Sequence, residues 1–329
     1  MVAPIPVKVV IVTAFETGDD QGDVPGELQL WVERLGLTRR YPLAAERDAR
    51  GNDEGVLALV TGVGTARAAA SVMALGLDAR FDVSKAYWLV AGIAGGDPAD
   101  TTLGSAVWAQ WVVDADLAYE LDAREMPADW PSGYLPWGKT RPYQQPANNR
   151  GEAFRLNGDL QNWAFELTRE MKLADNPRME QYRARFRGHA NAQKPPSVMK
   201  GDDLSGSTFW HGRLLSQRAN DWVSYWSGGT GNYVTTAMED TGTLHALTFL
   251  AKAKRVDLNR VMVLRTVSDF DSPPPDMTAA ESLVRGRSGA YFAVGEALEA
   301  AQSVGGRVVA ELVKNWDKYR DVVPSKSPH

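Results

Sequence analysis

The sequence predicts an α/β fold, and three observations support this prediction. Several short runs of β-branched and other apolar residues have the length and continuity of strands that are buried on both faces. One of these runs passes through a glycine turn into an Ala-rich segment, which is the pattern of a β-turn-α unit. Most of the runs end in glycine or acidic residues, and in α/β sheets the ligands bind beyond the carboxyl ends of the strands.

The expected elements follow in chain order. Residues 7–15, VKVVIVTAF, form a first strand, and residues 55–64, GVLALVTGVG, form a second that leads into the helix TARAAASVMALGL. Residues 85–96 and 260–271 are two further buried strands. The stretch MEDTG precedes an apolar helix, TLHALTFLA, and residues 279–319 have long helical character that is broken mildly at Gly305 and Gly306.

The segment from residue 119 to residue 200 differs in composition from its surroundings. It is rich in Pro, Trp, Asn and Arg, and its first part, PADWPSGYLPWGKTRPYQQPANN, is a loop by its many breakers, whereas residues 151–172 are expected to be helical. We interpret 119–200 as an insertion into a single domain of residues 1–325, followed by a tail at 326–329. The Trp-rich loop is a candidate lid over a pocket.

Composition excludes several classes of function. Hydrophobic residues make up 44% and charged residues 23% of the chain, as in folded globular proteins. The formal net charge of −5 is spread over mixed signs without a run of Lys or Arg, which argues against nucleic acid as a partner. Without Cys, thiol catalysis and Cys-ligated metals are excluded, and the 4 His residues form no cluster with metal-ligand spacing. We therefore expect neither a metal nor a cofactor.

The sequence also bears on the compartment. No stretch approaches the ~20 consecutive apolar residues of a membrane-spanning helix, so we expect a soluble protein without such a segment. The first residues, MVAPIPVKVVIVTAF, show no signal peptide. The protein is periplasmic or secreted if a signal peptide has been removed before this start, and cytoplasmic otherwise.

Two glycine-rich strand ends are candidate ligand contacts. In TGVG, Gly64 permits close backbone approach, and the following helix, which carries Arg67, offers free N–H groups to an anion. In AGIAGG, the backbone can lie against a flat ligand, but the GxGxxG spacing and later acidic residue of a dinucleotide site are missing. The alternative interpretation of TGVG is a tight strand-to-helix turn.

Aromatic and acidic residues make up two further clusters. In SGSTFWHG, Phe209 and Trp210 are suited to stacking on an aromatic ligand, and burial in the core is the alternative. In MEDTG, Glu239 and Asp240 either bind a ligand or interact with the helix dipole. Asp269, in SDFD at the end of a strand, is expected to be partly desolvated, with a raised pKa that suits a general acid.

The order of these motifs resembles a known superfamily, that of the nucleoside phosphorylases and nucleosidases. The resemblance rests on TGVGTARAAAS, AGIAGGDPADTTLGSAVWAQWVVDADLAYELD, SGSTFWHG, AMEDTGTLHAL and VLRTVSDFD. Within this superfamily the chain is most similar to the purine nucleoside permease family, through AREMPADWPSGYLP, FETGDDQGDVPGELQLWVERLGL and LRTVSDFDSP. The resemblance covers nearly the whole chain. It implies a three-layer α/β/α fold around a mixed, partly barrel-like sheet, with 119–200 as a family-specific insertion.

The resemblance also implies that a purine nucleoside binds at the strand ends. Met238 would pack under the sugar, and Glu239 would accept hydrogen bonds from the 2′- and 3′-hydroxyls of the ribose. Asp269 matches the acid that protonates N7 of the purine as the glycosidic bond breaks. Phe209 and Trp210 match the position that stacks on the base. The other base contacts expected on this ground are Ala91, Gly92, Ser268 and Asp271.

The chain departs from the superfamily pattern where an anion or a water would bind. Phosphorolytic relatives hold phosphate with an Arg and a Ser at the positions of Val90 and Ile93. Hydrolytic relatives activate water with a Glu at the position of Gly18, whose neighbours here are Glu16, Asp19 and Asp20. The water-activating base has therefore moved or is missing. Arg265 is a further candidate anion partner, with a structural role as the alternative. The candidate anion or water site comprises Gly18, Asp19, Gly64, Arg67 and Ile93.

Two functions follow from these residues. The first, which we favour because Asp269 is retained, is an enzyme that cleaves the N-glycosidic bond of purine nucleosides, by hydrolysis or with phosphate as co-substrate. The second is a non-catalytic nucleoside-capture protein that serves uptake, and the altered Val90, Ile93 and Gly18 favour it. Because the superfamily forms dimers, trimers or hexamers, we also expect a homo-oligomer. The preferred base stays open.

Overall fold

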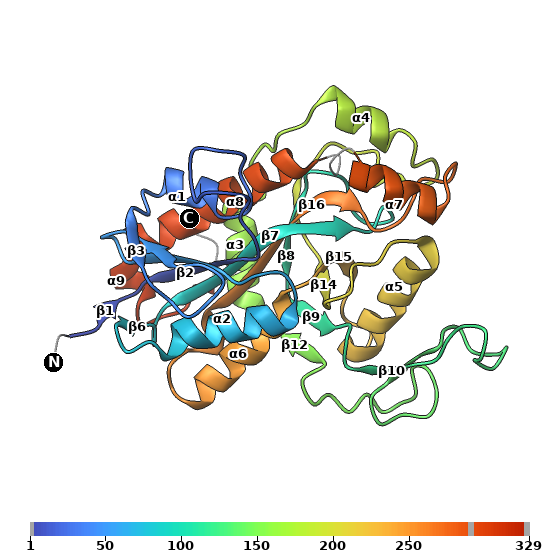
Figure 1. Ribbon diagram of the computed structural model, residues 1–329, viewed down its shortest axis with the longest axis horizontal. Helices are drawn as coiled ribbons and strands as arrows, with labels where there is room; N and C mark the ends of the chain where they lie inside the picture. Colours follow the sequence, from blue (N-terminus) through green and yellow to red (C-terminus); the bar gives the residue numbers. More distant parts are fainter. Residues whose placement is uncertain (1–2, 289–292, 326–329) are drawn as a thin grey trace.

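A large mixed β-sheet of 12 strands runs through the molecule, with helices on both of its faces (Figure 1). The computed structural model describes residues 3–288 and 293–325. The longest path through the sheet has the strand order β12-β9-β14-β15-β7-β2-β5-β4-β3, and β16 branches from β7. The predicted α/β fold with a mixed central sheet is confirmed.

Two strands of the large sheet, β7 and β16, are 10 residues long, and the others are shorter. The bounds are β2 Val9–Thr13, β3 Arg39–Tyr41, β4 Ala49–Gly51, β5 Val56–Val60, β7 Tyr87–Gly96, β8 Ala106–Ala109, β9 Trp111–Asp114, β12 Ala153–Arg155, β13 Val198–Lys200, β14 Asp202–Ser205, β15 Tyr233–Ala237 and β16 Val261–Phe270. Two small sheets pair β1 Ile5–Pro6 with β6 Phe81–Asp82, and β10 Ala118–Glu120 with β11 Tyr134–Pro136.

The four strands predicted from apolar runs, β2, β5, β7 and β16, lie together and run parallel. Along β2, Val9 and Ile11 face one apolar cluster, whereas Val10 and Val12 face another. Burial on both faces explains why these strands are continuously apolar instead of alternating. Because they are parallel, their carboxyl ends meet at one edge of the sheet, and the Asp269 end of β16 lies there beside the glycine-rich end of β7.

The sheet also closes partly on itself. β8 and β9 are almost consecutive in the chain, but β8 pairs with β16, whereas β9 pairs with β14. β14 pairs with β15, and β15 pairs with the end of β7 at Gly95 and Gly96. This ring of strands is the barrel-like part of the sheet that the resemblance implied.

Helices form the two outer layers (Figure 1). One layer contains α1 Gln29–Arg34, α3 Gly158–Thr168, α8 Val294–Lys314 and α9 Trp316–Tyr319. The opposite layer contains α2 Thr65–Leu77 and α6 Asp240–Lys252. The other helical elements are α4 Pro177–Arg183, α5 Arg213–Ser227, α7 Ala279–Ser288 and the 3-10 turn Leu258–Arg260. Among the helices of the described part of the chain, none is long and apolar enough to cross a membrane.

The helix expected over residues 151–172 is shorter than predicted. Strand β12 comes first, and α3 begins at Gly158. The side chain of Asn157 accepts hydrogen bonds from the backbone N–H groups of Asp159 and Leu160, so it caps the helix at this point.

The helix break predicted at Gly305 and Gly306 is wrong, because α8 continues through both residues. A Cβ atom at Gly305 would lie 2.7 Å from the ring of Trp31, so this glycine allows the helix to approach α1 closely. Within the predicted helical stretch 279–319, residues 289–292 lie outside the described residues, and the predicted tail at 326–329 also does.

The segment 119–200 has a peripheral part and a central part. The small β10–β11 sheet and the loops around it project from the edge of the molecule (Figure 1), and there Tyr119 stacks on Trp137 with a centroid distance of 4.6 Å. In contrast, β12, α3 and β13 belong to the large sheet and to the helical layer that covers it.

Candidate functional site

A cavity of about 340 Å³ lies at the carboxyl ends of the central parallel strands, where α/β folds bind their ligands. The turns after β2, the ends of β7, β15 and β16, and the residues just before α6 provide its walls. It is lined by Ala14, Phe15, Glu27, Val63, Ile93, Ala94, Gly95, Phe209, Thr236, Ala237, Met238, Glu239, Ser268 and Asp269. No residue of the segment 119–200, which contains the Trp-rich loop expected as a candidate lid, lines this cavity.

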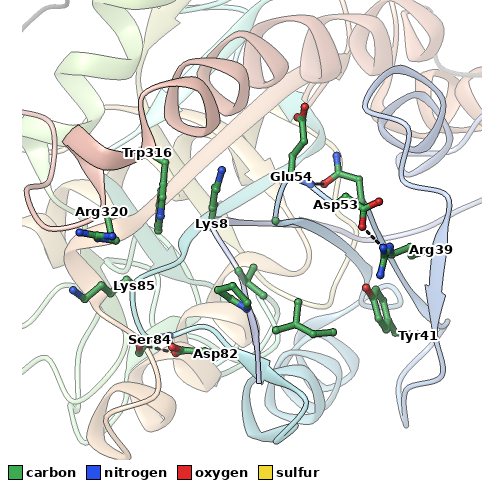
Figure 2. A pocket seen from close by; sticks show the side chains of 15 residues that line it. Lys8, Arg39, Tyr41, Asp53, Glu54, Asp82, Ser84, Lys85, Trp316 and Arg320 are labelled. Atoms are coloured by element: carbon green, nitrogen blue, oxygen red, sulfur yellow. Dashed lines mark hydrogen bonds and ion pairs between the residues drawn. The ribbon is translucent and has the colours of Figure 1, made fainter. Parts of the chain in front are cut away.

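A larger hollow, of about 540 Å³, lies at the opposite edge of the sheet, where the strands begin (Figure 2). Lys8 and Lys85 come just before β2 and β7, and both line it. Figure 2 shows Arg39 paired with Asp53 on one side of this hollow. It lies far from the motifs at the strand ends, and its charged groups are mixed in sign, so we place the functional site in the smaller cavity.

Glu239 projects into the cavity from the turn before α6 and is only 6% exposed. Its carboxylate accepts hydrogen bonds from the backbone N–H groups of Gly64 and Met238, both at 3.3 Å, and lies 3.5 Å from the guanidinium of Arg265. Burial raises the pKa of Glu239, and Arg265 partly opposes this rise. The carboxylate is thus held firmly at a cavity wall.

Asp240, the second acidic residue of MEDTG, has a different role. It is fully buried and accepts two hydrogen bonds from Arg265, through Nε at 2.9 Å and through Nη2. Asp203, on β14, lies beside this pair, and burial and the Asp240 carboxylate raise its pKa well above the usual range. The two adjacent acidic residues of MEDTG therefore have different positions: Glu239 faces the cavity, and Asp240 is hydrogen-bonded to Arg265.

Asp269 lies at the far end of β16 and lines the cavity beside Ser268, whose hydroxyl donates a 2.9 Å hydrogen bond to Oδ1. Burial raises the pKa of Asp269 to about 7, and the Ser268 hydroxyl opposes the rise. At neutral pH a substantial share of Asp269 carries a proton, which is the state required of a general acid.

Glu27 is the acidic residue that sequence reasoning did not find. Its Oε2 accepts a hydrogen bond from the N–H of Ala14 at 2.6 Å, and its Oε1 accepts one from the N–H of Ile93 at 2.7 Å. Burial raises the pKa of Glu27 to about 7; Arg265 lowers it and Glu239 raises it. A carboxylate with a pKa near 7 that is fixed in a cavity is suited to act as a general base.

The loop before Glu27 explains how this residue reaches the site. Glu16 follows the first strand, but its carboxylate accepts hydrogen bonds from the N–H groups of Leu28 at 2.8 Å and Gln29 at 2.6 Å. Arg47 donates to the carbonyl oxygens of Glu16 and Gly18, at 3.0 and 2.8 Å. The loop is therefore folded back on itself, and Glu27 emerges at its end. In the sequence, the signal was a Glu between Gly26 and the start of the short helix α1.

The candidate anion residues lie in different places. Gly18 and Asp19 do not line the cavity, and Ile93 does. The N–H of Gly64 is already bonded to Glu239. Arg67 is 65% exposed in its side chain and pairs with Glu46 at 3.7 Å. The structure does not gather these residues into one anion site.

Only some of the residues expected to contact the base line the cavity. Phe209 lines the cavity and is 45% exposed. Trp210 and Asp271 line a small adjoining cavity, where Tyr233 donates a 2.8 Å hydrogen bond to Asp271 and burial raises the pKa of Asp271 to about 8. Ala91 does not line either cavity.

Gly92 does not line the cavity either, but it makes room behind it. A Cβ atom there would lie 2.4 Å from Oε1 of Glu27 and 2.5 Å from Nη1 of Arg265. The absence of a side chain at this position thus allows the carboxylate of Glu27 and the guanidinium of Arg265 to approach each other. Within residues 3–288 and 293–325, no group of three or more His, Asp or Glu side chains could hold a metal ion.

Comparison with known families shows which family the chain belongs to. The model of the purine nucleoside permease family matches residues 6–324. The chain belongs to this family. A purine nucleoside permease of Candida albicans is 37% identical over 267 residues, which cover 79% of this chain and 64% of the relative. A probable purine nucleoside permease of Schizosaccharomyces pombe is 31% identical over 261 residues, or 76% of this chain and 73% of the relative. The match thus spans less than two thirds of the Candida protein.

Solved structures with a similar fold include a hydrolase and a nucleosidase. The futalosine hydrolase of Helicobacter pylori is similar over 93% of this chain and 98% of its own, with a TM-score of 0.55 and 17% identity. A 5′-methylthioadenosine/S-adenosylhomocysteine nucleosidase variant of the same organism is similar over 93% of this chain and 99% of its own, with a TM-score of 0.56 and 16% identity. At this identity the similarity establishes the fold, which is the nucleoside phosphorylase-like fold that the sequence predicted.

Proposed function

We propose that this protein hydrolyses the N-glycosidic bond of purine nucleosides. The observation that carries the proposal is the placement of Glu27 and Asp269 on one cavity, each with a pKa raised to about 7. Two carboxyl groups that titrate near neutral pH can act as a base and an acid in the same reaction. Membership in a family of purine nucleoside permeases, and a fold shared with nucleosidases, support a purine nucleoside as the substrate.

In the proposed mechanism, Asp269 donates one proton and Glu27 accepts another. As the bond between C1′ of the sugar and N9 of the base breaks, its electron pair goes to the purine, and Asp269 gives its proton to N7. A water molecule attacks C1′, and Glu27 takes the proton that this water loses. Glu239 binds the ribose hydroxyls through its fixed carboxylate. These contacts act on the charge that develops in the transition state, so they accelerate the reaction and do not merely bind the substrate.

The position of Glu27 favours hydrolysis over phosphorolysis. Its two carboxylate oxygens accept the hydrogen bonds of the backbone N–H groups of Ala14 and Ile93 at the strand ends. A phosphate bound here would need these same donors. Phosphate would also meet the negative charges of Glu27 and Glu239, while Arg265 is already bonded to Asp240. Water, being neutral, meets no such repulsion. The same reasoning excludes a 5′-phosphate close to these carboxylates and favours nucleosides over nucleotides.

The first test is the release of free base from inosine, guanosine and adenosine, measured by chromatography with and without phosphate. Release at equal rates under both conditions is the expected result. Glu27→Gln should lower this rate by ~10²–10⁴-fold, because the base that activates water is lost. Glu54→Gln, a change of an exposed Glu at the opposite edge of the sheet, is the control and should leave the rate unchanged. Release only in the presence of phosphate would contradict hydrolysis.

A second test concerns the sugar. Glu239→Gln should weaken nucleoside binding by on the order of tenfold or more, since a hydrogen bond to a charged group contributes ~1.5–3 kcal/mol. Binding of the free purine base should change little. Calorimetric titration with inosine and with hypoxanthine measures both, and an equal loss for the two ligands would show that Glu239 does not contact the ribose.

The second candidate function is nucleoside capture without cleavage. The relatives are named permeases, which favours it. Calorimetric binding of inosine without any release of base, with or without phosphate, would support capture and refute hydrolysis.

A further inference from the structure

The loop of residues 206–212 carries Phe209 to the wall of the nucleoside cavity. This loop joins β14 to α5, and Phe209 lines the cavity together with Asp269. The proposed reaction places N7 of the purine at Asp269, so the ring of Phe209 is within reach of the base and can stack on it. Because Phe209 is 45% exposed, the conformation of the loop contributes to where this ring lies.

Ser207, two residues before Phe209, is bonded to two other parts of the chain. Its backbone N–H donates a 2.7 Å hydrogen bond to Oδ2 of Asp116, in the loop after β9. Its hydroxyl accepts a 3.1 Å hydrogen bond from the backbone N–H of Thr65, the first residue of α2, and lies 2.8 Å from the Thr65 hydroxyl. A Cβ atom at Gly206 would lie 2.6 Å from Oδ1 of Asp116, so the glycine allows this carboxylate to reach the loop.

The start of α2 connects this loop to the carboxylate of Glu239. Gly64 has a φ angle of +98°, which residues with a side chain rarely adopt. In the turn that it forms, its own N–H donates to Glu239 at 3.3 Å, whereas the next N–H, that of Thr65, donates to Ser207. Two consecutive backbone donors therefore hold Glu239 and the loop of Phe209 in a fixed relation to each other.

We propose that Asp116 and Ser207 are positioning residues that hold Phe209 against the purine. This inference rests on the proposed function, which places the base beside Asp269. A ring that contacts the base in the bound substrate and in the transition state alike contributes to binding and not to the chemical step. Loosening the loop should therefore raise KM and leave kcat unchanged. Asp116 and Ser207 are both exposed, so their side chains can be changed without disturbing the core.

Asp116→Ala tests the proposal. The dissociation constant of hypoxanthine and KM for inosine should each rise by roughly three- to tenfold, the usual effect of one lost hydrogen bond, with kcat unchanged. Ser207→Ala, which removes the side-chain bonds to Thr65, should have an effect of similar size. Asp116→Asn should keep most of the affinity, because its side-chain oxygen can still accept the bond from the N–H of Ser207.

Asp82→Ala is the matched control. Asp82 is also exposed, and it accepts hydrogen bonds from the backbone N–H of Ser84 at 3.1 Å and from its hydroxyl at 2.7 Å. It lies at the opposite edge of the sheet, on the larger hollow. Its loss should change neither KM nor the affinity for hypoxanthine.

A variant of Phe209 shows whether Asp116 acts through this ring. Phe209→Ala should weaken hypoxanthine binding by on the order of tenfold, as is usual when a stacked aromatic side chain is lost. Adding Asp116→Ala to this variant should weaken binding little further, whereas independent effects would multiply. A full additional loss in the double variant would overturn the proposal, and so would an unchanged affinity and KM in both Asp116→Ala and Ser207→Ala.

Calorimetry with hypoxanthine needs no turnover, so it separates this proposal from the proposed function. If the variants weaken hypoxanthine binding as expected but the wild-type protein releases no base, hydrolysis fails and the positioning role stands. If base is released but Asp116→Ala and Ser207→Ala bind hypoxanthine as tightly as the wild-type protein does, the positioning role is refuted and hydrolysis stands.

Discussion

Asp269→Asn is expected to lower the rate of base release by ~10²–10⁴-fold, which is the usual contribution of a positioned general acid. Asn has nearly the same shape as Asp and can still bond to Ser268 and to the purine, so the affinity for inosine should stay within a few fold. It cannot give a proton to N7, and the leaving purine must then depart as an anion. Single-turnover measurement of free hypoxanthine gives the rate, and calorimetry gives the affinity.

The pH dependence of the wild-type protein belongs to the same prediction. Burial raises the pKa of Asp269 to about 7, and the acid works only in its protonated form, so kcat/KM, which reports the groups of the free protein, should fall as the pH rises through 7. Glu27, also with a pKa of about 7, works only in its ionised form, so kcat/KM should fall as the pH drops below 7. The result is a narrow bell centred near neutrality. Asp269→Asn should lose the alkaline limb, and an exposed Asp276→Asn variant should keep both limbs. Undiminished turnover in Asp269→Asn would rule out its role as acid.

Local sequence patterns were sufficient to predict the centre of the fold. The continuous apolar runs became β2, β5, β7 and β16 because helices cover both faces of these strands. The errors concern contacts between distant parts of the chain. Gly305 suggested a break in the last long helix, but its missing side chain serves the packing of α8 on Trp31, and a sequence pattern does not contain that neighbour.

In the candidate site, too, local patterns could be predicted and contacts between distant parts of the chain could not. Asp269 and Glu239 stand at a strand end and a helix start, which local patterns identify, and the structure places both on one cavity. Glu27 could not be found in this way, since its position depends on a loop that Glu16 and Arg47 fold back. The space that it fills beside Arg265 exists because residue 92, far along the chain, is a glycine. Burial and pKa shifts of this kind become visible only when the chain is folded.

Arg265→Met is expected to lower the free energy of unfolding by ~3–5 kcal/mol, as is usual when one partner of a buried ion pair is removed. Arg265 is 2% exposed and is the cation that Asp240 and Glu239 share, and it also lowers the pKa of Glu27. Burial alone would lower the pKa of Arg265, but the attraction of Asp240 outweighs this effect and raises it, so the guanidinium is always charged. Met fills a similar volume without charge and leaves these carboxylates uncompensated. Urea unfolding at neutral pH measures the loss.

The pH dependence of this loss identifies its cause. Without the guanidinium, the carboxyl groups of Glu27 and Glu239 should have still higher pKa values in the folded protein, while their pKa values in the unfolded chain stay near the usual range. A carboxyl group with a raised pKa in the folded state stabilises the fold least at high pH, so the destabilisation should grow as the pH rises from about 5 to 8. Arg260→Met is the matched control: Arg260 is also buried, but it bonds to the backbone carbonyl oxygens of Tyr319 and Arg320 and to the partly exposed Asp257. Its stability loss should be nearly independent of pH, and the same flat dependence in Arg265→Met would show that packing, not charge, is the function of this side chain.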